Sequence, residues 1–299
     1  MARSHLPERL FYRVFGTLLS QNASMQVTDK AYQESLDCVL VEKAGFRKSL
    51  NRLCNEEDWL DSRFLSLCRD LKGDEKSRKM WEYARTIIGL EDLNALCDES
   101  VVLSVGAGQE KLLYYLSNRI KRVIGIDLYD DGFPHEADSN FLANVWKSAP
   151  FHYNESNLEV RRMDACNLEF ESNTFDVVYS LSSIEHFGGY KAAGTCMREV
   201  ERVLKPGGIC CIATEYCLNR KKYSEFIELF SRQALYDHVI HSHGMDLAGG
   251  DIDWTMTKNT FLSCINLHDR GMRDRLPHIV LIKCGCLFTS VILFFRKAS

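Results

Sequence analysis

The stretch Val101-Val102-Leu103-Ser104-Val105-Gly106-Ala107-Gly108 decides the fold of this chain. Its short apolar run has the length of a buried β-strand, and the two glycines that close it allow a tight turn. Similar runs follow at Arg122–Asp127, Leu158–Asp164, Phe175–Ser180 and Ile209–Thr214. Amphipathic helical patterns lie between several of these runs. Apolar strands that alternate with helices predict an α/β fold, with a parallel sheet covered on both faces.

Two helices are expected between these strands, at Glu110–Asn118 and Tyr190–Leu204. Near the end of the chain, the apolar runs Ile279–Ile282 and Leu287–Phe295 flank Cys284-Gly285-Cys286. Because so short a connection cannot hold a crossover, these two runs must form an antiparallel hairpin. The last strand is therefore expected to be reversed relative to the rest of a mostly parallel, doubly wound sheet.

Helical patterns dominate the chain before residue 98. Apolar residues from Leu6 to Leu19 recur at helical spacing, and we expect further helices at Ala31–Lys43, Leu60–Leu71 and Ser77–Ile88. The expected organisation is therefore a helical N-terminal extension or cover followed by one α/β domain, and we place the boundary between residues 1–97 and residues 98–299.

A glycine-containing segment at about 220–275 is expected to form a substrate-facing insertion in that domain. It contains His241-Ser242-His243 and, further on, Asp246 and Asp251, which could ligate zinc or manganese. The neighbouring glycines favour a mobile loop in which these residues are only polar, so we predict no metal site.

Composition excludes several classes of protein. The chain has 299 residues, of which 45% are apolar and 26% charged, as is ordinary for a globular protein. Its net charge of -4 shows no basic excess, which argues against a nucleic-acid partner. The twelve cysteines include no C-x-x-C pair, and most of them lie among apolar residues, which indicates core packing in a reducing compartment.

The first residues carry charges where a signal peptide would have its apolar core. No apolar run approaches the roughly 20 residues of a membrane helix. We therefore expect a cytoplasmic protein without integral membrane association, and the sequence leaves its oligomeric state open.

The residues that follow the strands predict the ligand, because ligands of open α/β sheets bind at the carboxyl ends of the strands. A dinucleotide site needs a small residue where Lys111 stands, and a phosphate would be repelled by Glu110 at the helix start. Asp127 could accept hydrogen bonds from ribose hydroxyls, and Asp164 could accept one from the adenine amine. A nucleoside without phosphates fits these residues, and S-adenosylmethionine is such a compound.

Five segments in order resemble the motifs of class I S-adenosylmethionine-dependent methyltransferases: Val102–Gly108, Gly125–Asp127, Arg162–Ala165, Phe175–Ser180 and Arg202–Gly208. The resemblance covers roughly residues 98–215. It implies a Rossmann-like sheet of seven strands with a reversed last strand, S-adenosylmethionine as cofactor, and methyl transfer as the activity.

The resemblance also implies a set of cofactor-binding residues. These are Gly106, Ala107, Gly108, Asp127, Leu128, Asp164, Ala165, Ser180 and Leu181. Glu185 and His186 are the candidates for a catalytic base at the mouth of the site, although they could instead fix their loop by hydrogen bonding. The chain departs from the usual motif at Ser104 and at Gln109–Lys111, where many relatives have Asp or Gly and a small residue.

A narrower likeness is found at Trp81–Ala84, Asp127–Tyr129 and Ser182–Gly189. These segments are similar to bacterial methyltransferases associated with glycan and cell-surface polysaccharide biosynthesis. The likeness does not fix the substrate, and our first hypothesis is a small-molecule or glycan acceptor that is methylated at oxygen. A carboxylate, amine or quinone-like lipid acceptor remains open, as does a non-catalytic subunit that only binds S-adenosylmethionine. A nicotinamide dehydrogenase is disfavoured by Lys111.

Overall fold

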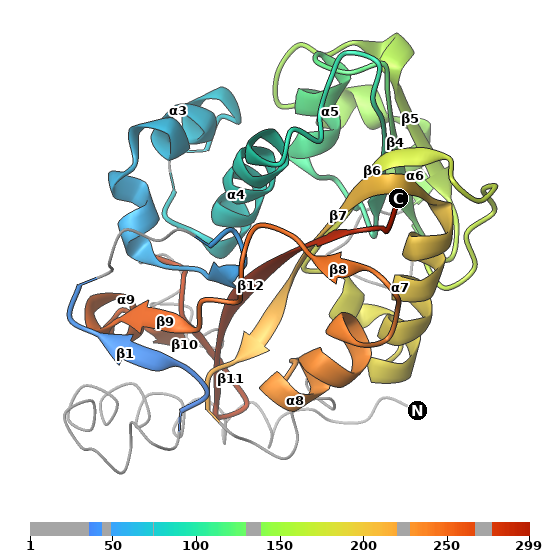
Figure 1. The fold of residues 1–299 in the computed structure, drawn as a ribbon. Coiled ribbons are helices and arrows are strands. Elements are labelled where there is room, and N and C mark those ends of the chain that lie inside the picture. Colours follow the sequence, from blue (N-terminus) through green and yellow to red (C-terminus); the bar gives the residue numbers. More distant parts are fainter. Residues whose placement is uncertain (1–35, 44–48, 74, 130–138, 220–227, 267–276) are drawn as a thin grey trace, which may run out of the picture.

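A computed structural model describes residues 36–43, 49–73, 75–129, 139–219, 228–266 and 277–299 (Figure 1). The helical pattern at Leu6–Leu19 lies outside these residues. The helix expected at Ala31–Lys43 is wrong where the chain is described, because strand β1 (Val39–Val41) pairs with strand β9 (Thr255–Thr257). Two valines in a run of three favour an extended backbone, and pairing with a distant strand overrides the apparent helical spacing.

The centre of the molecule is a sheet of ten strands in the order β10-β11-β12-β7-β6-β3-β4-β5, with β2 and β8 pairing with β12 off this path. The five strands expected from the alternating pattern are all present, and neighbours among them pair in parallel. They are β3 (Val101–Val105), β4 (Arg122–Asp127), β5 (Leu158–Arg162), β6 (Phe175–Leu181) and β7 (Leu204–Cys217).

The predicted terminal hairpin is confirmed. Strand β11 (Leu281–Lys283) turns through Cys284-Gly285 into β12 (Cys286–Arg296), and β12 runs antiparallel to both β11 and β7. The α/β fold class is thus confirmed, but the described sheet has ten strands and not seven. The difference arises because three short strands join its antiparallel side: β2 (Arg52–Leu53), β8 (Asp246–Leu247) and β10 (Ile265–Asn266).

Helices cover both faces of the sheet, with α4 and α5 on one face and α7 on the other (Figure 1). Four helices confirm expected ones: α3 (Ser62–Asp70), α4 (Arg78–Asp92), α5 (Lys111–Ser117) and α7 (Tyr190–Val203). The remaining short elements are η1 (Glu56–Leu60), α6 (Ser139–Ala143), η2 (Val145–Ser148), η3 (Glu155–Asn157), η4 (Ile184–His186), α8 (Arg232–Leu235), η6 (Tyr236–Ile240) and α9 (Lys258–Leu262).

Helix α4 packs tightly on the sheet although it precedes the first parallel strand. Ser77 begins the helix, and its Oγ accepts a hydrogen bond from the Met80 backbone N–H at 3.3 Å. A Cβ atom on Gly89 would lie 2.1 Å from the Phe294 ring, so glycine allows the helix to approach β12 closely. Together with β2, which pairs with β12, α4 ties the described N-terminal residues into the core of the sheet.

Part of the expected substrate-facing insertion lies at the other end of the sheet. Strand β8 pairs with Phe295 and Arg296 of β12, and Arg296 pairs with Ile209 near the start of β7. The predicted site lies at the carboxyl ends of the parallel strands, which is the opposite edge of the sheet. The expectation that this segment faces the site is therefore wrong for β8. Trp254 packs against the Tyr216 ring at 5.0 Å and the Arg232 guanidinium at 4.5 Å, which holds it on the core.

All twelve cysteines are free thiols and most are buried, including Cys210 and Cys211 of β7, as the composition predicted. In the parts of the chain that the structure describes, we find no helix both long and apolar enough to span a membrane.

Candidate active site

A cavity of about 640 Å³ lies where the order of the parallel strands reverses, between β3 and β6. It is lined by residues that directly follow β3, β4, β5 and β6. Eight of the predicted site residues line it: Gly106, Ala107, Gly108, Asp127, Leu128, Asp164, Ala165 and His186. We use the name sheet wall for the part formed by the turns after β3, β4 and β5.

The turn after β3 requires glycine. Gly106 and Gly108 have φ angles of 70° and 46°, in the left-handed region that glycine adopts without strain. A Cβ atom on Gly106 would lie 2.5 Å from the Cβ of Ser183. The Ser183 hydroxyl in turn donates a hydrogen bond to the Gly106 carbonyl at 2.7 Å. At the cavity, the backbone of the loop after β3 therefore contacts a side chain of the loop after β6.

Asp127 is fixed at the end of β4 by two backbone donors. Its Oδ2 accepts from the Gly108 N–H at 2.9 Å, and its Oδ1 accepts from the Leu128 N–H at 2.7 Å. Burial raises the pKa of Asp127, while these hydrogen bonds oppose the rise. Each oxygen keeps a lone pair, so the carboxylate could also accept hydrogen bonds from the two hydroxyls of a ribose.

Asp164 caps the turn that follows β5, a role that it could have in place of adenine binding. Its Oδ1 accepts from the Cys166 N–H at 2.8 Å, so it caps the turn after β5. It is exposed and lines the cavity, and its second oxygen is available to an exocyclic amine. Both roles are compatible in this geometry.

Three predicted residues are not among those lining the cavity. Ser180 and Leu181 are fully buried at the end of β6. Glu185 is also buried, and its carboxylate accepts hydrogen bonds from the Thr214 hydroxyl at 2.8 Å and the Glu215 N–H at 3.3 Å. Burial, followed by the neighbouring Glu215 carboxylate, raises the pKa of Glu185 to about 7, although His186 opposes the rise. Glu185 thus anchors the loop after β6, whereas its neighbour His186 faces the cavity.

His186 is paired with a carboxylate that sequence reasoning did not identify. Its Nδ1 lies 3.3 Å from Oε2 of Glu228, which also lines the cavity. Lys283 approaches the same Glu228 oxygen at 3.4 Å. A histidine with one ring nitrogen held by a carboxylate presents its other nitrogen in a defined tautomer, which is the arrangement of a general base.

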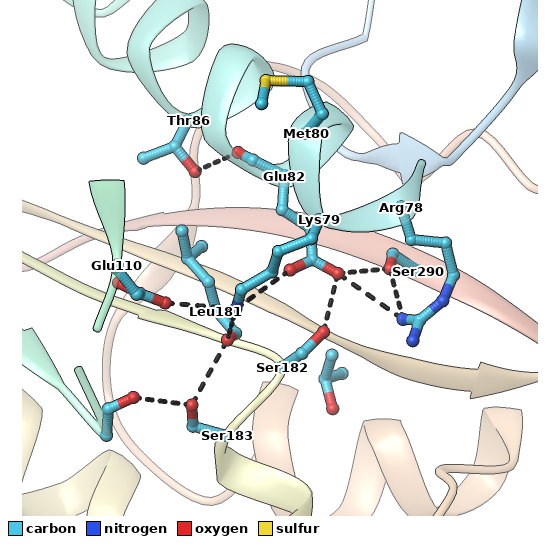
Figure 2. Close-up of polar contacts among 12 residues, drawn as sticks. Arg78, Lys79, Met80, Glu82, Thr86, Glu110, Leu181, Ser182, Ser183 and Ser290 are labelled. Carbon is cyan, nitrogen blue, oxygen red and sulfur yellow. Dashed lines mark hydrogen bonds and ion pairs between the residues drawn. The ribbon is translucent and has the colours of Figure 1, made fainter. Parts of the chain in front are cut away.

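Helix α4 forms a further part of the cavity lining. Lys79 and Tyr83 line the cavity, and we use the name helix wall for these two residues together with Glu82 behind them. The Lys79 ammonium donates to the Leu181 carbonyl at 2.6 Å and to Oε1 of Glu110 at 3.2 Å. It also lies 3.5 Å from Oε2 of Glu82, so it stands between two carboxylates (Figure 2).

Glu82 joins α4 to the loop after β6 and to β12. The side chain is fully buried, and Oε1 accepts hydrogen bonds from the hydroxyls of Ser182, at 2.6 Å, and Ser290 (Figure 2). Arg78 completes the group: its guanidinium donates to Ser290 at 2.9 Å and to Glu215 at 2.6 Å. A polar network beneath the cavity thus holds four chain segments together.

Glu110 decides what kind of ligand the cavity fits. It begins helix α5, is only 3% exposed, and accepts a hydrogen bond from the Ser104 hydroxyl at 3.3 Å. Burial raises the pKa of Glu110 to about 7, while the Lys79 ammonium opposes the rise. A carboxylate at this helix start would repel a phosphate. The donors and acceptors of the cavity therefore fit an adenosyl compound with cationic groups, as S-adenosylmethionine is.

Sequence reasoning missed the helix wall, although one signal was present. Lys79 and Glu82 lie on the same side of a helix whose residues from Met80 to Leu90 are all buried. Charged side chains on a buried helix face need partners, and such partners are often found at functional sites. The spacing could have indicated a buried ion pair, but not its partner Glu110.

His241 and His243, which the sequence offered as possible metal ligands, have other contacts in the structure. His243 accepts a hydrogen bond from the Met245 N–H at 3.0 Å and meets the Phe295 ring edge-on, while His241 packs on Tyr236. Within the described ranges, no group of three or more potential ligands could hold a metal ion.

Comparison with known proteins identifies the class. Residues 103–212 match the family model described as a methyltransferase domain. Over these residues the chain carries a methyltransferase domain of the class I S-adenosylmethionine-dependent type, and S-adenosylmethionine is the methyl donor of this family.

Solved structures share the fold at low identity. The 4+2 cyclase SpnF is 14% identical, with a TM-score of 0.50 over 82% of this chain and 98% of its own. Phosphoethanolamine N-methyltransferase 2 from Haemonchus contortus, solved with S-adenosyl-L-methionine, is 18% identical, with a TM-score of 0.50 over 83% of this chain and 61% of its own. At these identities the likeness shows the fold alone.

Proposed function

We propose that the protein methylates a hydroxyl group of a small molecule or glycan. The observation that carries this proposal is the pair formed by His186 and Glu228, 3.3 Å apart at the cavity. An alcohol must lose its proton when its oxygen is methylated, whereas an amine can be delivered already neutral. The likeness of Trp81–Ala84 and Ser182–Gly189 to glycan-associated methyltransferases supports a sugar as the acceptor.

Bound S-adenosylmethionine supplies an electrophilic methyl group on a positively charged sulfur. The cofactor would be held by Gly106, Ala107 and Gly108 on its methionine side and by Asp127 and Leu128 at the ribose. Asp164 and Ala165 would flank the adenine.

His186 would accept the hydroxyl proton at Nε2 while Glu228 retains the proton on Nδ1. General-base assistance of this kind contributes about 10²–10⁴-fold. Alignment of the acceptor in the cavity can contribute about 7–11 kcal/mol more. Glu185 would act indirectly, because its hydrogen bonds to Thr214 and Glu215 fix the loop that carries His186.

We also propose that residues 1–97 act as a cover that completes the site and that residues 98–299 form the catalytic domain. The position of Lys79 and Tyr83 at the cavity supports this division of labour. The twelve free thiols support a reducing, cytoplasmic setting.

The proposal is tested by turnover with a panel of sugar, phenol, amine and carboxylate acceptors, measured as release of S-adenosylhomocysteine. We expect turnover with one or more hydroxyl acceptors. Turnover with amines or carboxylates alone would overturn methylation at oxygen. Tight binding of S-adenosylmethionine without turnover on any acceptor would favour a non-catalytic binding subunit.

A further inference from the structure

A cluster of two buried carboxylates and one partly exposed ammonium borders the cavity where the helix wall meets the start of α5 (Figure 2). It consists of Glu82, Lys79 and Glu110, and the two carboxylate side chains are 0% and 4% exposed. The Lys79 ammonium lies 3.5 Å from Glu82 and 3.2 Å from Glu110. Two carboxylates thus share one ammonium, and the fully ionised cluster has a net negative charge in surroundings of low dielectric constant.

The neighbouring Arg78 does not cancel this charge. Its guanidinium approaches Glu82 at 3.6 Å but is held 2.6 Å from Glu215. Glu185 lies beside Glu215 and adds a further carboxyl group. The enlarged group therefore contains more acidic than basic side chains.

The cluster lies at the end of the cavity that the adenosine would leave unoccupied. With the ribose at Asp127 and the adenine at Asp164, the rest of the cofactor must extend across β3 towards β6, because the strand order is β5-β4-β3-β6. Lys79, Glu110 and Ser183 line that part of the cavity. The methyl donor carries a positively charged sulfur there, and the demethylated product carries a neutral one.

Resting on the proposed placement of the cofactor in this cavity, we propose that the Glu82–Lys79–Glu110 cluster discriminates by charge between S-adenosylmethionine and S-adenosylhomocysteine. Glu110 is ionised when the sulfonium is bound and takes up a proton when the ligand is the neutral thioether or is absent. The cluster therefore favours the substrate over the product and assists product release. The α-amino group is present in both compounds, so its interactions cancel in this comparison.

The groups that face Glu110 allow such a proton exchange. Burial raises the pKa of Glu110 to about 7, and Lys79 opposes the rise while Glu82 adds to it. The other titratable neighbours come from four elements: Tyr83 of α4, Tyr129 after β4, Tyr179 of β6 and Cys211 of β7, and burial raises the pKa of each. They stay neutral near pH 7, so they do not exchange protons when Glu110 does.

The test is calorimetric titration of the full-length chain with S-adenosylmethionine and with S-adenosylhomocysteine at pH 6, 7 and 8. Ionised Glu110 favours the cation, so the preference for S-adenosylmethionine should increase about three- to tenfold from pH 6 to pH 8. At pH 7, titrations in two buffers with different ionisation enthalpies should show that S-adenosylmethionine releases more protons on binding. A preference that stays flat with pH in the wild-type protein overturns the proposal.

Variants separate this cluster from other groups that titrate. Glu110→Gln should flatten the pH dependence, whereas Glu99→Gln, at an exposed carboxylate paired with Lys121, should leave it unchanged. His186→Asn should also retain it, because His186 lies outside the cluster. A dependence that persists in Glu110→Gln but disappears in His186→Asn would overturn the assignment to Glu110.

The placement of the cofactor is tested separately with Asp127→Ala. We expect this change to weaken both ligands alike, with the neutral nucleoside 5′-methylthioadenosine as a third probe. Unchanged binding of all three would overturn the placement in this cavity. Weakened binding of all three, together with a flat pH dependence in the wild-type protein, would overturn only the charge discrimination.

Discussion

The two walls of the cavity are built in opposite ways. In the sheet wall, Gly106–Gly108, Asp127 and Asp164 lie at or just after the ends of parallel strands, and most of their hydrogen bonds are to backbone groups. In the helix wall, Lys79 reaches Leu181 and Glu82 reaches Ser182 and Ser290, across 100 to 208 residues of chain. The sheet wall consists of backbone turns, whereas the helix wall consists of charged side chains whose partners are distant in the sequence.

This difference separates two tasks of the site. Backbone turns at strand ends are rigid and recur wherever this sheet forms, so they suit the part of the ligand that does not change in the reaction. Buried charges are sensitive to the charge of their neighbours because the surrounding dielectric constant is low. They suit the part of the ligand whose charge changes. The predictions that follow probe the two walls and the loop after β6 that joins them.

The largest effect is expected at His186, in the loop where the two walls meet. His186→Gln should lower kcat about 10²–10⁴-fold, because the hydroxyl proton loses its acceptor. The affinity for S-adenosylmethionine should stay within about twofold, since the sheet wall is untouched. Steady-state kinetics combined with calorimetry check both quantities.

Glu228→Gln gives the matched comparison for this prediction. Glu228 acts through His186 as a positioning residue, so its loss should lower kcat less and should shift the pH profile of kcat. If His186→Gln turns over at the wild-type rate, His186 only orders its loop, and the proposed base is wrong.

Glu82→Ala tests how much the helix wall contributes to folding. Its removal leaves the hydroxyls of the half-buried Ser182 and the buried Ser290 without their carboxylate acceptor and Lys79 with one partner fewer. Breaking such a buried group should reduce the free energy of unfolding by about 3–5 kcal/mol. Urea unfolding measures this loss, and Glu82→Gln, which retains the shape, should lose less.

Asp92→Ala on the same helix is the control for Glu82. Asp92 pairs with Arg63 at 2.6 Å, but both side chains are 40% or more exposed. Exposed pairs contribute less than about 1 kcal/mol. Equal losses at Asp92 and Glu82 would show that α4 tolerates the loss of its buried carboxylate as easily as that of an exposed one.

Asp127→Ala tests the sheet wall. Two charge-assisted hydrogen bonds to a ribose, worth about 1.5 kcal/mol each, would be lost, and S-adenosylmethionine should bind about 100-fold more weakly. Asp164→Ala should have a smaller effect on binding, because one oxygen of Asp164 is engaged by its own turn. The change in dissociation constant, measured by calorimetry, checks the order of the two effects.

The same difference explains what could be read from the sequence. Strands β3 and β4 occupy the expected residues because apolar periodicity is local, and the turns at their ends placed Gly106, Asp127 and Asp164 at the cavity. The spacing at Val39–Val41 looked helical because pairing with β9 is not encoded nearby. Likewise, nothing near Lys79 indicates that Glu110 and Leu181 will be its partners.

Sequence patterns do not show which way the side chains of adjacent loop residues point. Glu185 and His186 were predicted as one catalytic pair, yet His186 lines the cavity while Glu185 is buried against Thr214. The short helix η4, which contains both residues, turns successive side chains in different directions. Sequence placed the loop correctly, and only the backbone geometry assigned the two side chains to different environments.

The smallest effect concerns the pH dependence of stability and the buried acid Glu185. Burial and the Glu215 carboxylate raise the pKa of Glu185 from 4.5 to about 7 in the folded protein. The protonated group therefore contributes stability that is fully present below about pH 4.5 and is lost as the pH rises through about 7. Glu185→Gln removes this loss, so relative to the wild type it should gain about 1–3 kcal/mol in unfolding free energy between pH 5 and pH 8.

Urea unfolding at several pH values measures this difference, and Glu99→Gln, at an exposed position, should show no such trend. A constant difference between wild type and Glu185→Gln would mean that Glu185 keeps one protonation state throughout this range. Glu110, which lines the cavity, would then be the one remaining acid whose protonation distinguishes the helix wall from the sheet wall in the described residues.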